Sequence, residues 1–158
     1  MFEMFKATIS KFKNSDENLK NEEIKNEEFK ALNSIVALLV EAASIDGNIG
    51  LDEKNQIKTI LTDQLNLEII KADEILEEAI SNSSEQIEIW SKTNDIRKEL
   101  DYEERLNILE LMWEIVLVDD IIDVFEAQLM RRVSGLLYIS DIDSGNSKKR
   151  AIQKLKNN

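Results

Sequence analysis

The sequence contains neither cysteine nor histidine among its 158 residues. The lack of cysteine excludes disulfide bonds and thiolate nucleophiles. The lack of histidine excludes Ser-His-Asp and Cys-His catalysis and any imidazole metal ligand. A metal site in this chain would therefore consist of oxygen atoms, which favours hard cations such as Ca²⁺, Mg²⁺ or Mn²⁺.

Residues that form turns are also scarce, because the chain has no proline and only four glycines. It is instead rich in residues that favour helices, such as leucine, glutamate and lysine. The composition predicts an all-α fold, and the length is that of a single domain with a substantial core.

Acidic residues dominate the charge, with 32 Asp and Glu against 20 Lys and Arg and a net charge of −12. Both ends are basic, with +2 in residues 1–13 and +5 in residues 144–158, so residues 14–143 carry −19. Such an acidic body repels phosphate backbones, which argues against nucleic acid as a partner. Cations or basic protein surfaces are the expected partners.

No stretch of the sequence is typical of a secretory signal or a membrane span. The longest uncharged apolar run, from Ala31 to Val40, is about half the length of roughly 20 residues that a spanning helix needs. We therefore expect a cytoplasmic protein of unknown oligomeric state.

The N-terminal segment, residues 1–25, differs from the rest of the chain. Residues 1–13 have an apolar helical stripe with lysines beside it, typical either of a basic amphipathic helix on a membrane or a partner, or of a terminal helix packed on the protein's own core. Residues 14–28 are polar and predict a solvated linker. The predicted division is a leader and linker over residues 1–25 and a helical domain over residues 26–158.

The helical domain is expected to contain about seven helices. Apolar periodicity and capping residues place them at about 27–45, 52–65, 67–80 and 85–98, from 101 up to a turn at 119–120, through 126–137, and from 140 or 141 to 155. Asn66 is predicted to cap the third of these helices. Trp113 and Phe125 are predicted to lie in the core. Trp90 stands on a more polar helix and is expected either in the core or as a surface anchor, with the core favoured.

Two parts of this domain resemble each other at a constant offset of 73 in the numbering. The hydrophobic residues Val36, Leu39 and Ile49 match Leu109, Met112 and Ile122. The acidic residues also coincide, Asp46 with Asp119 and Glu53 with Glu126. The shared spacing indicates a duplicated helix-turn-helix and hence two pseudo-symmetric halves.

The first acidic turn, D-G-N-I-G-L-D-E from Asp46 to Glu53, matches only the second half of a calcium-binding EF-hand loop. The positions of the first two carboxylates are occupied by Ala42 and Ser44, and by Ile115 and Leu117 in the second copy. A complete EF-hand is therefore excluded.

The duplicated acids still form a candidate metal site if the two halves pack about a pseudo-twofold axis. Four ligands are predicted, Asp46, Glu53, Asp119 and Glu126, with Asp52, Asp120 and Asp123 as additional candidates. Carboxylates brought together repel one another unless a cation neutralises them. In the alternative interpretation they are ordinary solvated acids of turns and helix starts, which the helix dipole favours.

The apolar helix, the acidic turn with its glutamate, their duplication and the closing L-L-Y-I-S from Leu136 to Ser140 resemble the TerB family, named for bacterial tellurite-resistance proteins. The resemblance covers about residues 26–155 and is closest to stand-alone members with a short Met-Phe leader. It implies an all-helical fold of two related halves and a presumed divalent-cation site made by the four matched acids. It also implies association with stress-response complexes at the inner face of the membrane. Asp120 stands where the family's Asp-Gly turn has glycine.

Three functions are compatible with these features. The leading hypothesis is a non-catalytic module that binds a divalent cation and presents a surface to protein partners in a stress response. The second is an acidic scaffold or peripheral membrane adaptor that uses residues 1–13 and no metal. The third, a metal-dependent hydrolase, is disfavoured because no lysine or arginine lies within the acidic turns to hold a phosphate.

Overall fold

The computed structural model describes residues 19–45, 48–82, 89–119 and 122–157, and for residues 19–29 and 119 it describes the backbone alone. The helices run in the order α2 (Leu19–Ala43), α3 (Leu51–Thr59), the π-helical η1 (Ile60–Gln64), α4 (Ile69–Asn82), α5 (Ile89–Glu99), α6 (Tyr102–Val116), the 3₁₀ segment η2 (Leu117–Asp119), α7 (Val124–Leu136) and α8 (Asp141–Lys156). No strand occurs in these ranges, so the all-α prediction is confirmed.

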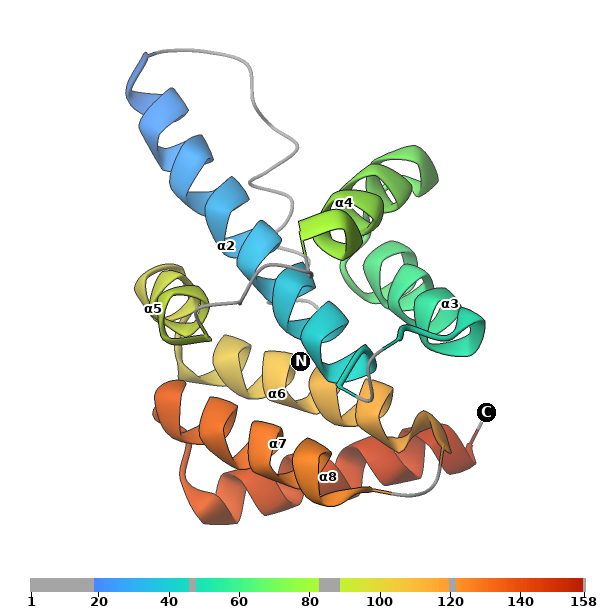
Figure 1. Cartoon of the computed structure of the whole chain (residues 1–158). Coiled ribbons are helices and arrows are strands. Elements are labelled where there is room, and N and C mark those ends of the chain that lie inside the picture. Colours follow the sequence, from blue (N-terminus) through green and yellow to red (C-terminus); the bar gives the residue numbers. More distant parts are fainter. Residues whose placement is uncertain (1–18, 46–47, 83–88, 120–121, 158) are drawn as a thin grey trace.

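Helices α2 and α6 form the centre of the domain. In Figure 1, α2 runs diagonally between α5 on one side and α4 on the other, while α6 lies beneath it. α2 packs against α4, α5 and α6, and α6 packs in addition against α7 and α8. Every residue of α6 from Leu106 to Val116 is buried, because the sequence of this helix is apolar on almost every side.

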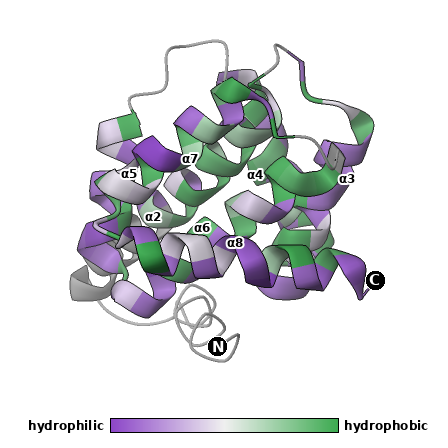
Figure 2. Ribbon diagram, turned by 90° about the horizontal axis from the view of Figure 1, so that it is seen from below, coloured by the Kyte–Doolittle hydropathy of each residue, from purple (hydrophilic) through white to green (hydrophobic). Residues whose placement is uncertain are grey.

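The matched apolar residues of the two halves lie in one hydrophobic core. Val36 and Leu39 on α2 and Leu109 and Met112 on α6 are all completely buried. The peripheral helices are amphipathic, and Figure 2 shows apolar and polar residues alternating along α8, as expected for a helix with one buried side.

The predicted duplication is visible in the positions at which helices begin. α3 begins at Leu51 and α7 at Val124, which reproduces the offset of 73. α4 begins at Ile69 and α8 at Asp141, so the offset between these two helices is 72. The first half therefore has one extra residue between the start of its second helix and the start of its third.

The π-helical turn η1 accounts for this extra residue. The Leu65 N–H donates to the Ile60 carbonyl oxygen at 3.0 Å, five residues back, instead of to the carbonyl four residues back. The left-handed residues that follow, Asn66 and Tyr138, both have φ of 57° and are again related by the offset of 72. The insertion therefore falls within η1, and the two halves return to the same turn geometry after it.

Several predicted boundaries and environments need correction. The linker prediction for residues 14–28 is wrong from Leu19 onward, where α2 begins, because the lysines and glutamates of this stretch favour a helix once the buried half of α2 anchors it. The helix crosses the predicted boundary between residues 25 and 26, and the division into leader and domain stays a prediction. Asn66 is not a helix cap, since it adopts the left-handed conformation that asparagine tolerates.

The aromatic residues are also distributed differently from the prediction. Trp113 is buried as expected, but Trp90 and Phe125 are exposed. Both lie in the first turn of their helices, α5 and α7. A residue in the first turn can continue the apolar pattern of a helix although no neighbouring helix covers it.

Candidate functional site

The two acidic turns connect α2 to α3 and α6 to α7. Each turn is attached to the core by apolar residues: Ile45 and Ile49 in the first and Ile122 in the second are partly buried and pack against it. Ile49 and Ile122 are one of the pairs matched by the repeat. The hydrophobic part of the duplicated motif therefore fixes both turns to the core.

The predicted ligands differ in how far the structure describes them. Asp46 and Asp120 lie outside the described residues, and Asp119 belongs to η2, where only the backbone is described. Asp52 is exposed in the first turn of α3. The structure therefore gives side-chain geometry for Glu53, Asp123 and Glu126.

Asp123 and Glu126 form a capping box at the start of α7. The Glu126 N–H donates to Asp123 Oδ1 at 2.8 Å, and the Asp123 N–H donates to Glu126 Oε1 at 3.5 Å. The exchange satisfies two backbone donors that the first turn of a helix leaves without partners. Asp101 and Glu104 form the same arrangement at the start of α6.

Glu53 takes the corresponding position in α3. Its carboxylate folds back over Gly50, the N-cap residue, so closely that a Cβ atom at Gly50 would collide with Glu53 Oε2. Glu53 and Glu126 thus share the third position of their helices as well as the position in the repeat. The motif D-x-x-E, which predicts a capping box, was the sequence signal for this role at Glu126.

A cation at the turns would depend on the aspartates that precede these glutamates. Among the residues whose side chains the structure describes, no three acidic groups converge to hold a metal ion. Glu53 and Glu126 alone therefore do not make a site, and Asp46, Asp119 or Asp120 would have to complete it. A set of carboxylate oxygens is chemically suited to Ca²⁺, Mg²⁺ or Mn²⁺.

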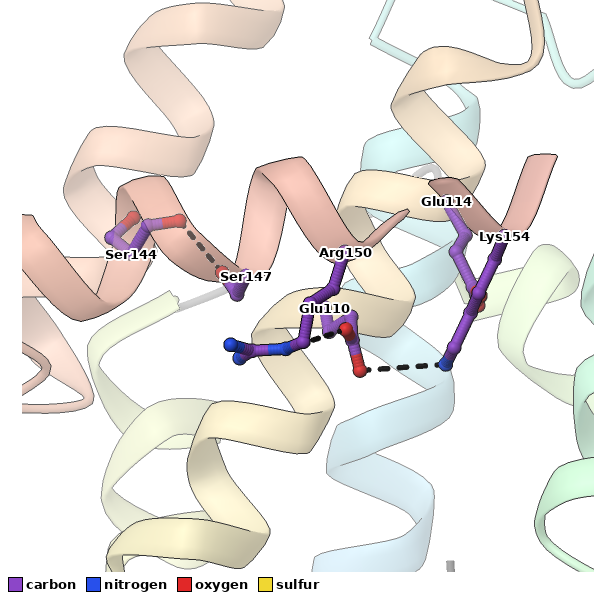
Figure 3. Close-up of polar contacts among 6 residues, drawn as sticks. All are labelled: Glu110, Glu114, Ser144, Ser147, Arg150 and Lys154. Carbon is purple, nitrogen blue, oxygen red and sulfur yellow. Dashed lines mark hydrogen bonds and ion pairs between the residues drawn. The ribbon is translucent and has the colours of Figure 1, made fainter. Parts of the chain in front are cut away.

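Sequence reasoning missed a second group of acids, which is buried between α6 and α8. Glu110 and Glu114 lie one turn apart on α6, and Figure 3 shows Arg150 and Lys154 of α8 reaching toward them. Arg150 Nε is 2.9 Å from Glu110 Oε1. Lys154 Nζ is 3.4 Å from Glu110 Oε2 and 3.4 Å from Glu114 Oε1.

Glu114 also connects the two halves of the domain. Gln64, the last residue of η1, donates from Nε2 to Glu114 Oε2 at 3.2 Å. Burial raises the pKa of Glu114 and nearby Glu110 raises it further, while Lys154 and the Gln64 hydrogen bond oppose the rise. The basic and amide partners make this cluster a structural tie and leave no free base for catalysis.

The counterpart of Glu114 in the first half is Glu41, at the same offset of 73. Both glutamates are the third residue from the end of their helices, α2 and α6. Burial raises the pKa of Glu41 as well, but no described side chain forms an ion pair or hydrogen bond with its carboxylate. The repeat offset was the sequence signal that could have found this pair.

The sequence matches the model of a known protein family. It is described as tellurite resistance protein TerB and matches residues 32–149, which include both acidic turns and the first half of α8. No curated protein and no solved structure matches the chain significantly.

Proposed function

Since the chain belongs to the TerB family, we propose that it is a non-catalytic module that binds a divalent cation at its acidic turns and acts as an adaptor in a stress response. The duplicated turns carry this proposal. Each joins a central helix, α2 or α6, to a helix whose third residue is a glutamate. Isoleucines of both turns, Ile45, Ile49 and Ile122, pack against the core.

The proposed cation site adds metal binding to the capping role of Glu126, whose helix position Glu53 shares in α3. In a capping box the glutamate presents one oxygen to the backbone, as Glu126 Oε1 does, and a carboxylate has further lone pairs to offer a metal. The nearby aspartates Asp46, Asp119 and Asp120 would supply the remaining ligands. Asp52 and Asp123 would add negative charge that attracts the ion.

Exposed apolar residues support an interaction with a protein partner. Leu51 and Val124, the first residues of α3 and α7, are both exposed, and so are Ile70 and Ile142, the second residues of α4 and α8. Each pair occupies equivalent positions in the two halves. Leu51 and Val124 directly follow the acidic turns in the chain. Exposed apolar side chains next to acids suit a partner that is both apolar and basic.

The cation is tested by thermal unfolding of the EDTA-treated protein with and without Ca²⁺, Mg²⁺ or Mn²⁺ at constant ionic strength. An ion that binds only the folded state stabilises it by about 2.7 kcal/mol at a hundredfold excess over its dissociation constant. We expect the substitutions Asp46→Asn and Asp119→Asn to reduce the shift. Asp63→Asn, at an exposed acid of η1, is the matched control.

Two results would refute the metal site. One is the absence of any midpoint shift with all three ions at millimolar concentration. The other is a shift of the same size in Asp63→Asn and in both turn variants, which would indicate general screening of the acidic surface. Either result would leave Asp123 and Glu126 with only their capping role at the start of α7.

The expected location at the inner face of a membrane is a separate question from cation binding. No described helix combines the length and the apolar character that crossing a bilayer requires. Location at the inner face of a membrane is a separate proposal, with the contact made through a partner. Sedimentation of the protein with vesicles, with and without a membrane extract, would test this.

A further inference from the structure

The exposed side of α7 carries two neighbouring arginines without an acidic partner. Arg131 and Arg132 are both exposed, and neither forms an ion pair within the part of the chain that the structure describes. The chain as a whole has 32 acidic residues against 20 basic ones. Although acids are abundant, the fold leaves these two cations available for a group outside the domain.

The first half shows how the position of Arg131 is used when it is paired. Lys58 of α3 lies at this position, at the repeat offset of 73, and its Nζ is 3.1 Å from Asp73 Oδ1 of α4. At the offset of 72 that applies after η1, the residue equivalent to Asp73 is Gly145 of α8. The second half has thus kept the cation and lost the acid, and an acidic helix from outside could take its place.

Exposed residues without charge extend this side of α7. Val124, Gln128 and Arg132 are all exposed and follow one another at intervals of four residues, so they lie on one face of the helix. One turn further on, a Cβ atom at Gly135 would meet no atom within 4 Å, so this end of the face is open. We call the face formed by Val124, Gln128, Arg131 and Arg132 the basic face of α7.

Helix α4 has an exposed face of opposite charge. Ile70, Glu74 and Glu78 are exposed and also follow one another at intervals of four residues. We call the face formed by these three residues the acidic face of α4. Figure 1 shows α4 and α7 on opposite sides of the domain, with α2 and α6 between them, so the two faces do not meet within one chain.

We propose that the acidic face of α4 in one copy of the chain binds the basic face of α7 in another copy. With the two helices parallel, a single register matches both faces over eight residues, or about 12 Å. At a constant difference of 54 in the numbering, the pairs are Ile70 with Val124, Glu74 with Gln128, and Glu78 with Arg132. The first pair is apolar, the second lets an amide donate to a carboxylate, and the third joins opposite charges.

The contact joins two different surfaces and is therefore head-to-tail. Such a contact leaves a free face at each end of the pair, so further copies can add and form a chain or a ring. Ile70 and Val124, which are assigned above to a protein partner, would then contact a second copy of the same protein. None of the proposed metal ligands takes part, so the contact stands or falls separately from the cation site.

Sedimentation equilibrium of the full-length protein, in EDTA and at low ionic strength, measures this association. We expect the apparent mass of the wild type to rise with concentration beyond that of a dimer and to fall when salt is added. Arg132→Glu and Glu78→Arg each place like charges opposite one another and should weaken the association about tenfold or more. The double variant Glu78→Arg/Arg132→Glu restores opposite charges and should associate as the wild type does.

Two control variants separate this contact from the effect of net charge. Lys98→Glu changes the charge by the same amount as Arg132→Glu, at an exposed position of α5. Asp63→Arg matches Glu78→Arg in the same way, at an exposed position of η1. Both controls should associate as the wild type does, and a loss of association equal to that of the face variants would refute the proposed contact.

Disulfide cross-linking tests the register, because the chain has no cysteine of its own. In Glu74→Cys/Gln128→Cys we expect oxidation to link different chains into a ladder of dimers, trimers and larger species, since a disulfide requires Cα atoms within about 7 Å. Each single variant, and the control pair Glu74→Cys/Lys98→Cys, should remain monomeric on a denaturing gel.

Other occupants of the basic face would give different results. Dimers formed by Gln128→Cys alone would mean that α7 meets α7 of the second copy, which overturns the proposed pairing. A wild type that stays monomeric at every concentration, with no ladder in the double cysteine variant, would refute self-association. If that monomer also sediments with phosphatidylserine vesicles, and Arg131→Glu/Arg132→Glu abolishes the sedimentation, the basic face binds a membrane instead.

Discussion

Lys154 is the residue whose loss should most clearly reveal the buried charge cluster. Its Nζ lies 3.4 Å from both Glu110 and Glu114, whose side chains are only 4% exposed. In Lys154→Met the methylenes of the side chain are largely retained, but Glu114 keeps only the neutral Gln64 as a partner. Arg150 continues to neutralise Glu110. The substitution therefore isolates the uncompensated charge of Glu114.

The loss of unfolding free energy caused by Lys154→Met can be estimated from how exposed the charged side chains are. Removing one member of a fully buried ion pair costs about 3–5 kcal/mol. The Lys154 side chain is 31% exposed, so solvent already screens part of the interaction. We expect Lys154→Met to lower the free energy of unfolding by about 2–3 kcal/mol at neutral pH.

The stability difference between Lys154→Met and the wild type should become smaller as the pH falls. The folded-state pKa of Glu114 is already raised by burial, and removing Lys154 eliminates one of the interactions that oppose this rise. A carboxyl whose pKa is higher in the folded than in the unfolded state destabilises the fold when it is charged, at pH above its folded pKa. It ceases to do so below its unfolded pKa, near the ordinary value of 4.5. The difference between variant and wild type should therefore narrow on acidification.

Urea unfolding followed by tryptophan fluorescence would measure this at several pH values, with Trp113 as the buried reporter. Lys149→Met removes the same charge from the exposed side of α8 and should change the stability by no more than about 0.5 kcal/mol. Glu114→Gln/Lys154→Met should recover most of the loss, since it removes both charges of the pair. Equal losses in the two lysine variants, or a loss independent of pH, would refute the argument.

Three further substitutions test other parts of the structure. Asp123→Ala removes the cap of α7 and should cost about 1 kcal/mol in urea unfolding; an unchanged midpoint would contradict the capping box. Met112→Ala creates a cavity at a completely buried position and should lower the free energy of unfolding by about 2–5 kcal/mol. A loss below about 1 kcal/mol would mean that the core between α2 and α6 is loosely packed. Glu41→Gln removes a carboxyl whose pKa burial raises, so it should stabilise the protein at neutral pH and have no effect below about pH 4. Glu78→Gln removes one negative charge from an exposed position of α4, and an equal gain in this variant would contradict the argument.

The hydrophobic pattern was sufficient to predict the fold class and the duplication. Burial of apolar surface dominates folding, and its periodicity along the chain can be read directly. Leu39 and Met112 could thus be paired before their positions in the core were known. The π-helical turn η1 could not be predicted from the sequence. A single inserted residue needs no particular side chain, and the apolar spacing before and after it stays helical.

The candidate site was predictable to a smaller extent. The sequence identifies Glu53 and Glu126 as equivalent positions, but spacing does not distinguish a carboxylate that caps a helix from one that binds a metal. The environment of Glu114 depends on Gln64 and Lys154, which are both distant from it in the sequence, and is a consequence of tertiary packing. Even so, the offset of 73 also connects Glu41 with Glu114, and this link required only a longer comparison of the two halves.

The two halves differ most in whether the buried glutamates of the central helix are neutralised by basic residues. On α6, two glutamates face α8 and are neutralised within the fold, and one of them is also tied to the first half through Gln64. On α2, one glutamate at the equivalent place has no described cation, and the π-helical insertion has moved the rest of the first half by one residue relative to the second. A buried charge cluster costs desolvation free energy, so the cluster on α6 is better explained by specificity than by stability: it fixes the register of α8 on α6.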